Sequence, residues 1–312
     1  MDDPPRGERV VTVGVCSRNR PESLARCLRS LGMADAMVEG ITVYDDGSEP
    51  PLEPAVRAIL GDALPARTRF VRSDASRGLS VGRNRIAREA GTPYVLNLDD
   101  DAMLVTARAV ADAVAVLRGD ESVAAVAFAQ SDAEGTPWPA GAQPAPVDYA
   151  CVVPSFIGYA HLLRRDAFLA AGGFREGMRM HGEEKDLCMR LMERGLRVVY
   201  LPDTRIAHLA DPAGRDRAEY LFLTIRNDVL GGVYNEPLPV LALTAPARLS
   251  RYFRMRRGMG LHDPGGFGRI LRALGRELPA AWGARHGVGL RTWRRWRRLL
   301  RERPRYQPPA AP

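Results

Sequence analysis

Short apolar runs that end in acidic or polar clusters alternate with helix-like segments over the first 200 residues. Residues 10–15, 41–44 and 94–98 are β-branched or apolar and predict buried strands. Segments 80–90 and 106–117, which lie between or after such runs, have helical periodicity. This alternation predicts an α/β fold, with a mostly parallel sheet flanked by helices. Because ligands bind beyond the carboxyl ends of such strands, the polar clusters there are the first candidates for function.

The later part of the chain divides into two regions. Further strands are expected at residues 69–72, 123–129 and 197–201, a helix at 183–194, and a surface loop at 131–148. From about residue 215 the pattern changes to helices and loops. We therefore expect a catalytic domain over residues 1–214 and a helical, arginine-rich region over residues 215–312.

Charge separates the two regions. The chain has a formal net charge of +8, yet residues 248–305 hold 17 arginines against three acidic residues, a net charge of +14. The remainder must therefore carry −6. Near residue 296, apolar and basic side chains fall on opposite sides of a predicted helix, which indicates either an interfacial helix drawn to anionic lipid or a helix packed on the domain through its tryptophans. No recognised motif accompanies the arginines, so nucleic-acid binding is not expected.

Three features of the sequence indicate the compartment, namely its apolar runs, its first residues and its cysteines. It has no apolar run long enough to span a membrane, and its acidic, polar start does not resemble a secretory signal. The cysteines, Cys16, Cys27, Cys151 and Cys188, are scattered and indicate buried thiols in a reducing compartment. We expect a cytoplasmic protein, with peripheral contact at the inner face of the membrane if the basic helix binds lipid.

The strongest local signal is the triplet Asp99, Asp100 and Asp101, directly after an apolar run. Adjacent carboxylates repel one another unless a cation neutralises them, and hard oxygen ligands suit Mg²⁺ or Mn²⁺. Such a metal can stabilise a diphosphate as it leaves. A solvated acidic turn is the alternative.

Other polar groups have both a functional and an ordinary interpretation. Asp45 and Asp46 could accept hydrogen bonds from a nucleoside or form a simple turn. Glu183, Glu184 and Asp186 could supply a general base or merely favour the first turn of a helix. His208 could be a metal ligand, although a lone histidine usually is not.

Taken in order, these segments resemble family 2 glycosyltransferases of the GT-A fold over roughly residues 10–209. The family's opening turn, its V-D-D-G-S and A-R-N segments, its D-x-D, G-G-F-D-E and G-E-D-x-D-L motifs and a later histidine have counterparts here. These are Ser17-Arg18-Asn19-Arg20-Pro21-Glu22, Tyr44-Asp45-Asp46-Gly47-Ser48, Gly82-Arg83-Asn84, Asp99-Asp100-Asp101, Gly172-Gly173-Phe174-Arg175-Glu176, Gly182-Glu183-Glu184-Lys185-Asp186-Leu187 and His208.

The resemblance implies an inverting transfer from a nucleoside-diphosphate sugar, with Mn²⁺ or Mg²⁺ on the diphosphate. A UDP-sugar is favoured and a GDP- or TDP-sugar is the alternative; the acceptor would be a hydroxyl of a carbohydrate, a lipid-linked molecule or a natural product. By position, Asp99 would contact ribose and Asp101 the metal; the D-x-D motif also makes Asp99 a metal-ligand candidate, with His208 as a further one. The family's base is the aspartate of E-D; here Glu184 stands there, with Glu183 and Asp186 as alternatives. The donor-binding candidates are Ser17, Arg18, Asn19, Arg20, Asp45, Asp46, Arg83, Asp99 and Asp100.

Two rival functions come from other classes. A sugar nucleotidyltransferase would carry a glycine-rich basic loop after the first strand, where this chain has residues 17–20 instead. A catalytically decayed protein that binds a membrane or nucleic acid is the second. The intact acidic clusters at three element ends argue against it.

Overall fold

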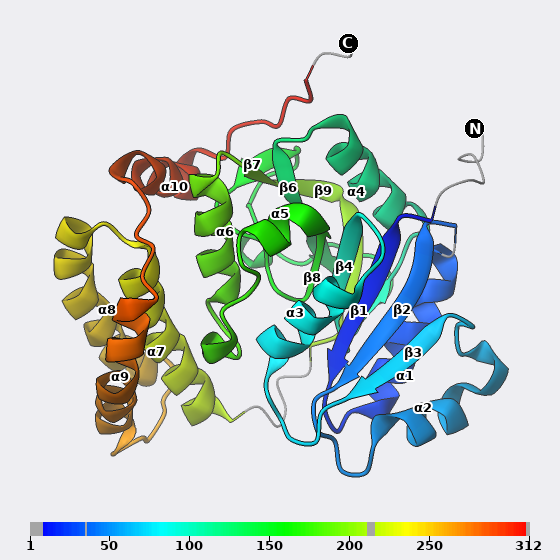
Figure 1. Cartoon of the computed structure of the whole chain (residues 1–312), viewed down its shortest axis with the longest axis horizontal. Helices are drawn as coiled ribbons and strands as arrows, with labels where there is room; N and C mark the ends of the chain where they lie inside the picture. Colours follow the sequence, from blue (N-terminus) through cyan, green and yellow to red (C-terminus); the bar gives the residue numbers. More distant parts are fainter. Residues whose placement is uncertain (1–8, 35, 211–215, 310–312) are drawn as a thin grey trace.

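A computed structural model describes residues 9–34, 36–210 and 216–309. Within them, one sheet has the strand order β3-β2-β1-β4-β8-β6-β9-β5, and β7 pairs with β9 (Figure 1). The pairings β3-β2, β2-β1, β1-β4 and β6-β9 are parallel, while the other four, those of β8 with β4 and β6 and of β5 and β7 with β9, are antiparallel. The strands are β1 Val11–Ser17, β2 Val38–Asp45, β3 Thr68–Arg72, β4 Tyr94–Asp99, β5 Ala102–Leu104, β6 Val123–Ser131, β7 Cys151–Val153, β8 Ala160–Arg164 and β9 Arg197–His208.

Helices cover both faces of the sheet, as the alternation predicts. One apolar core joins the sheet to α1, α2 and α4, and a second joins it to α3, α5 and α6. The short 3₁₀ turns are η1 Leu31–Ala34, η2 Gly61–Ala63, η3 Ala140–Ala142 and η4 Glu176–Met178. The helices are α1 Pro21–Ser30, α2 Leu52–Leu60, α3 Leu79–Glu89, α4 Arg108–Gly119, α5 Arg165–Ala170 and α6 Glu183–Glu193.

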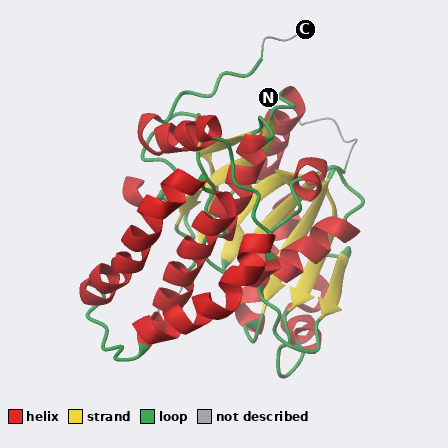
Figure 2. Cartoon of the chain, turned by 60° about the vertical axis from the view of Figure 1, so that its left-hand side comes forward, coloured by secondary structure: helices red, strands yellow, loops and turns green. Residues whose placement is uncertain are grey.

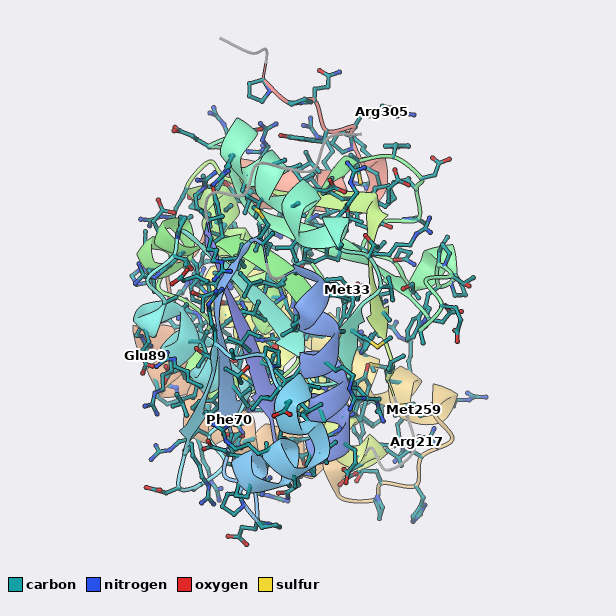
Figure 3. The ribbon with its side chains drawn as sticks, turned by 90° about the vertical axis from the view of Figure 1, so that its right-hand side faces the viewer. Met33, Phe70, Glu89, Arg217, Met259 and Arg305 are labelled. Carbon is teal, nitrogen blue, oxygen red and sulfur yellow. The ribbon has the colours of Figure 1, made fainter. Side chains whose placement is uncertain are left out.

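The C-terminal region is helical, as expected (Figure 2), and has a core of its own. Helices α7 Arg217–Asn235, α8 Leu238–Gly258 and α9 Gly266–Gly283 share a cluster that includes Leu221, Ile225 and Tyr252. Figure 3 shows Arg217, at the start of α7, beside Met259 after α8; the Arg217 guanidinium donates to the Met259 carbonyl. The expected boundary at residues 214 and 215 lies outside the described residues.

The last helix, α10 Leu290–Glu302, packs back onto the sheet domain. Trp296 and Leu299 are buried against Met189 and Met192 of α6 and against Val152 of β7. Of the two interpretations of this helix, the structure therefore has the one in which the tryptophan side packs on the domain. Its arginines remain largely exposed. In the described part of the chain, no helix has the length and apolarity that a membrane crossing needs.

Candidate active site

The acidic triplet lies where β4 ends, and the loop after β1 holds two of its members. The Ser17 hydroxyl donates to Asp100 at 2.6 Å. The Arg20 guanidinium spans two carboxylates, with Nη1 2.6 Å from Asp100 Oδ1 and Nη2 3.1 Å from Asp101 Oδ2. Burial raises the pKa of Asp100 to about 7. Ser17 and Arg20 therefore act on the triplet, and Asp100 is engaged by protein groups.

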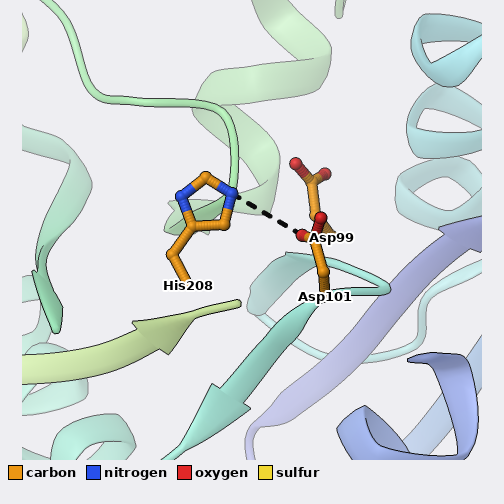
Figure 4. A group of neighbouring side chains, drawn as sticks. All are labelled: Asp99, Asp101 and His208. Carbon is orange, nitrogen blue, oxygen red and sulfur yellow. Dashed lines mark ion pairs between the residues drawn. The ribbon is translucent and has the colours of Figure 1, made fainter. Parts of the chain in front are cut away.

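The pairing of β5 with β9 brings His208 beside the triplet. Ala102 faces His208 across this antiparallel pair. Asp101, the residue before Ala102, therefore lies next to the imidazole. Nε2 of His208 is 3.6 Å from Oδ1 of Asp101, with Asp99 alongside (Figure 4). One ligand atom from each of Asp99, Asp101 and His208 lies within 4.8 Å of the others. The three predicted metal ligands are thus brought together.

Neighbouring residues fix the orientation of the His208 ring. Its plane is stacked between Trp138, at a centroid distance of 5.3 Å, and Tyr159, at 4.7 Å. Its Nδ1 lies 2.5 Å from Oε1 of Gln130, whose amide nitrogen donates to the Ala142 carbonyl. Because that amide oxygen can only accept, Nδ1 is the nitrogen that donates to Gln130, and Nε2 is the nitrogen that faces Asp101.

These groups fit a divalent cation. Oδ1 of Asp101 is buried without a hydrogen-bond partner among the described residues. Two carboxylates and one neutral imidazole nitrogen form a donor set that Mn²⁺ accepts well and Mg²⁺ accepts through its oxygens. An unpartnered buried carboxylate oxygen is costly unless a ligand occupies it.

A buried arginine joins this cluster to the candidate bases. Arg83 is 1% exposed; its Nη2 donates to Asp99 at 2.8 Å and to the Gly158 carbonyl at 2.6 Å. Nη1 lies 3.9 Å from Oε1 of Glu183. A side chain at position 158 would overlap the Glu184 carboxylate and would lie 3.5 Å from Nη1 of Arg83. Arg83 is therefore flanked by Asp99 and by both glutamates.

The two glutamates differ from Asp186 in their surroundings. Burial raises the pKa of Glu184 and raises that of Glu183 well above its usual range, and Oε2 of Glu183 has no hydrogen-bond partner among the described residues. Asp186 instead receives hydrogen bonds on both oxygens, from Arg175, Arg190 and Asn235. Asp186 thus fastens α6 to its neighbours, whereas Glu183 and Glu184 face the site.

The remaining donor-binding candidates lie where β1 and β2 end. Asp45 accepts the backbone N–H groups of Ser48 and Leu52, at 2.8 and 3.0 Å. Asp46 accepts from the Ser76 hydroxyl and from the backbone N–H groups of residues 77 and 78. Asn19 accepts from the Glu49 N–H, and Arg18 is exposed. Asp45 therefore shapes the loop after β2, and Asp46 shapes the loop between β3 and α3.

Sequence reasoning missed the residues that orient others. Gln130, Trp138, Tyr159 and Gly158 come from three separate segments and carry no local motif. Only the pairing of β6 with β9, where Gln130 faces Ile206, places Gln130 near His208.

Comparison with known proteins places this geometry in a family. The model of glycosyl transferase family 2 matches residues 12–172. The pre-mycofactocin glycosyltransferase of Mycobacterium tuberculosis is 30% identical over 222 residues, which is 66% of this chain and 44% of that protein. The O-antigen biosynthesis protein RfbC of Myxococcus xanthus is 31% identical over 126 residues, 38% of this chain and 9% of that protein. The chain thus spans less than half the length of these curated relatives.

Solved structures share the fold. A mannosyltransferase from Pyrobaculum calidifontis, in complex with GDP-Man and Mn²⁺, matches with a TM-score of 0.57 at 19% identity, over 93% of this chain and 84% of that one. A structure of GalNAc-T7 with UDP, GalNAc and Mn²⁺ matches with a TM-score of 0.59 at 14% identity, over 88% and 58%. These likenesses confirm the expected GT-A-type fold. Because the family model covers half of the chain, this protein belongs to glycosyl transferase family 2.

Proposed function

We propose that the chain is an inverting glycosyltransferase that moves a sugar from a nucleoside-diphosphate sugar to an acceptor hydroxyl. The observation that carries the proposal is the cluster of Asp99, Asp101 and His208 within 4.8 Å, joined through Arg83 to the buried Glu183, with the half-buried Glu184 beside it. A cation site beside a general base is the arrangement that such a transfer needs.

Asp99, Asp101 and His208 would hold Mn²⁺ or Mg²⁺. The cation would neutralise charge on the departing diphosphate. Gln130 accepts a hydrogen bond from Nδ1 of His208 and so leaves Nε2 to face the cation, and Arg20 holds the Asp101 carboxylate in place from its other oxygen. In the proposal Asp99 also contacts the ribose.

Two structural relatives support a nucleotide-sugar donor, since one contains GDP-Man and the other UDP, each with Mn²⁺. We favour a UDP-sugar here, with GDP- and TDP-sugars as alternatives. A nucleoside contact by Asp45 and Asp46 stays a prediction. Their carboxylates already hold the backbone of residues 48, 52 and 76–78, so we expect them to act chiefly by shaping the nucleoside pocket.

Glu184 is the proposed base, with Glu183 as the alternative. As the acceptor oxygen bonds to the anomeric carbon, the bond from that carbon to the diphosphate breaks on the opposite face. The acceptor proton passes to the carboxylate, and configuration inverts. Asp186 is excluded from this role in the proposal because three side chains occupy its oxygens.

The acceptor class stays a hydroxyl of a carbohydrate, a lipid-linked molecule or a natural product. We also propose a cytoplasmic location with peripheral contact at the inner face of the membrane. Four buried free cysteines support a reducing compartment, and the exposed arginines of α10 support an electrostatic contact with anionic lipid. The sugar nucleotidyltransferase alternative is not supported, because residues 17 and 20 bind the acidic triplet rather than form a phosphate loop.

Thermal stabilisation by a nucleotide panel tests the proposal. UDP, GDP, TDP and CMP, with their sugars, are added with and without Mn²⁺. We expect one nucleoside diphosphate to raise the melting temperature only with the metal, because a ligand bound to the native state stabilises it. Asp101→Asn should fold and lose the metal-dependent part of the shift. No shift with any nucleotide would overturn the proposal and favour the decayed-enzyme alternative.

A further inference from the structure

The segment of residues 177–182, which leads into α6, has a backbone that must be held from outside. Arg179, His181 and Gly182 have φ values of 52°, 68° and 91°. Residues with side chains rarely adopt this left-handed region unless surrounding contacts impose it. The Gly182 carbonyl accepts the Asp186 N–H in the first turn of α6, so the shape of this segment sets where Glu183 and Glu184 lie.

One side chain of α7 holds the segment. Nδ2 of Asn227 lies 2.7 Å from the Met178 carbonyl oxygen, 2.7 Å from that of Met180 and 2.8 Å from that of His181. Asn227 is 1% exposed. The three carbonyls therefore share one amide nitrogen, which has only two hydrogens to donate.

Arg226 fixes the direction of that amide. Its Nη1 donates to Oδ1 of Asn227 at 2.6 Å, which turns Nδ2 towards the carbonyls. The same guanidinium donates to the Gly177 carbonyl at 3.1 Å and to Glu277 of α9 at 2.7 Å. Two adjacent residues of α7, Arg226 and Asn227, therefore hydrogen-bond to the segment.

The opposite side of the segment contacts the donor side of the site. The Arg179 carbonyl accepts the Ser80 N–H at 3.4 Å, and the Arg179 guanidinium donates to the Ser76 hydroxyl at 3.2 Å. The Ser76 hydroxyl in turn donates to Asp46 at 2.8 Å. The segment thus lies between the C-terminal helices and the loop that Asp46 organises.

We propose that Asn227 is a positioning residue for sugar transfer: it holds residues 178–181 so that the first turn of α6 presents its glutamates to the site. The inference rests on the proposed function. It assigns to the C-terminal helices a role in the chemical step, although none of their side chains belongs to the cation cluster.

The test compares Asn227→Ala with Tyr252→Phe in the full chain. Tyr252 is equally buried in α8 and donates to Asp263, so its variant perturbs the C-terminal helices without touching the segment. The probes are UDP binding with Mn²⁺ and hydrolysis of UDP-glucose, with water as the acceptor. We expect Asn227→Ala to lower kcat about 100-fold while the Kd of UDP stays unchanged, and Tyr252→Phe to alter neither.

Hydrogen–deuterium exchange of residues 177–184 is the second measurement, and it needs no turnover. Exchange there should rise in Asn227→Ala and stay at the wild-type level in Tyr252→Phe. If Asn227→Ala does not fold, Asn227→Ser, which retains one donor, should show a smaller change in the same direction. Unchanged kcat with unchanged exchange would overturn the inference. A wild-type protein that neither binds nucleotide nor hydrolyses UDP-glucose would instead overturn the proposed function, and exchange alone would then decide the role of Asn227 in holding the segment.

Discussion

The Gln130 amide oxygen accepts a hydrogen bond from Nδ1 of His208, and we expect metal binding to depend on this contact. Gln130→Ala removes the acceptor for Nδ1–H. The neutral imidazole can then carry its proton on Nε2, and that nitrogen no longer has a lone pair for the metal. Loss of a group that orients a metal ligand typically lowers metal affinity by about 10–100-fold. Titration with Mn²⁺, followed by calorimetry, measures the change.

Gln130→Glu is the matched control. A carboxylate still accepts from Nδ1, although it loses the amide's bond to the Ala142 carbonyl. Mn²⁺ affinity should therefore stay near the wild-type value. Equal losses in the two variants would mean that Gln130 acts through the fold of the loop after β6 and not through the tautomer.

The raised pKa of Glu184 predicts how turnover depends on pH. Burial raises its pKa above the ordinary value of 4.5, and a general base works only when deprotonated. Turnover should therefore fall as pH drops through this raised pKa, at a higher pH than an exposed glutamate would give. The midpoint belongs to the Glu183–Glu184 pair, because the two titrate together.

Profiles of kcat against pH for two variants separate the glutamates. Glu184→Gln should abolish transfer and leave UDP binding intact. Glu183→Gln should keep activity and an acid limb close to the wild-type position, because Glu183, whose pKa is raised further, is already neutral while Glu184 titrates. The reverse pattern would make Glu183 the base.

How far sequence could predict the site depends on how local each contact is. Asp99, Arg83 and the two glutamates carry motifs, and the structure places these three carboxylates around the Arg83 guanidinium. Asp45 and Asp46 carry a motif too, yet their oxygens bind backbone N–H groups of residues 48, 52, 77 and 78, which no local pattern indicates. Gln130 and Asn227 act on residues 78 and 46–49 positions away, so only the assembled fold connects them.

Among the elements that were predicted, β9 is longer than expected. The apolar pattern indicates a strand over residues 197–201, but β9 continues to His208. The polar residues Asp203, Thr204 and Arg205 interrupt that pattern, and pairing with β5 and β6 supplies the hydrogen bonds that extend the strand. The small strands β5 and β7 were missed because three residues are too few for periodicity to indicate a strand.

The docking of α10 gives a prediction at this scale. Trp296 is 7% exposed, contacts the α6 cluster and has Lys185 Nζ 5.0 Å from its ring centroid. Trp296→Ala should lower the free energy of unfolding by about 3 kcal/mol, since a large buried side chain leaves a cavity. Urea denaturation measures this. Arg294→Ala, on the exposed side of the same helix, should change it by less than about 0.5 kcal/mol. A similar small effect for both would mean that α10 is not docked in solution.

In the whole molecule, charge is divided unevenly between the two regions. Residues 248–305 carry +14 and the remainder −6, while the buried side of α10 holds Trp296 and Leu299. With those side chains engaged against α6 and β7, the proposed contact of α10 with an anionic membrane would rely mainly on its exposed arginines. Such attraction is screened when the Debye length falls from about 8 Å at physiological salt to about 3 Å at 1 M.

Vesicle sedimentation with phosphatidylserine tests this mode of contact. The protein should bind these vesicles at low salt, dissociate from them at 1 M salt and not bind neutral vesicles. Each arginine near the surface contributes about 1 kcal/mol, so the triple variant Arg291→Ala, Arg294→Ala and Arg301→Ala should bind roughly 100-fold more weakly. Trp282, 55% exposed on α9, supplies the contrast, because Trp282→Ala should matter little if the contact is electrostatic. Binding that persists at 1 M salt and is lost in Trp282→Ala would mean that the C-terminal helices insert apolar side chains, and that the charge separation is not what draws the protein to the membrane.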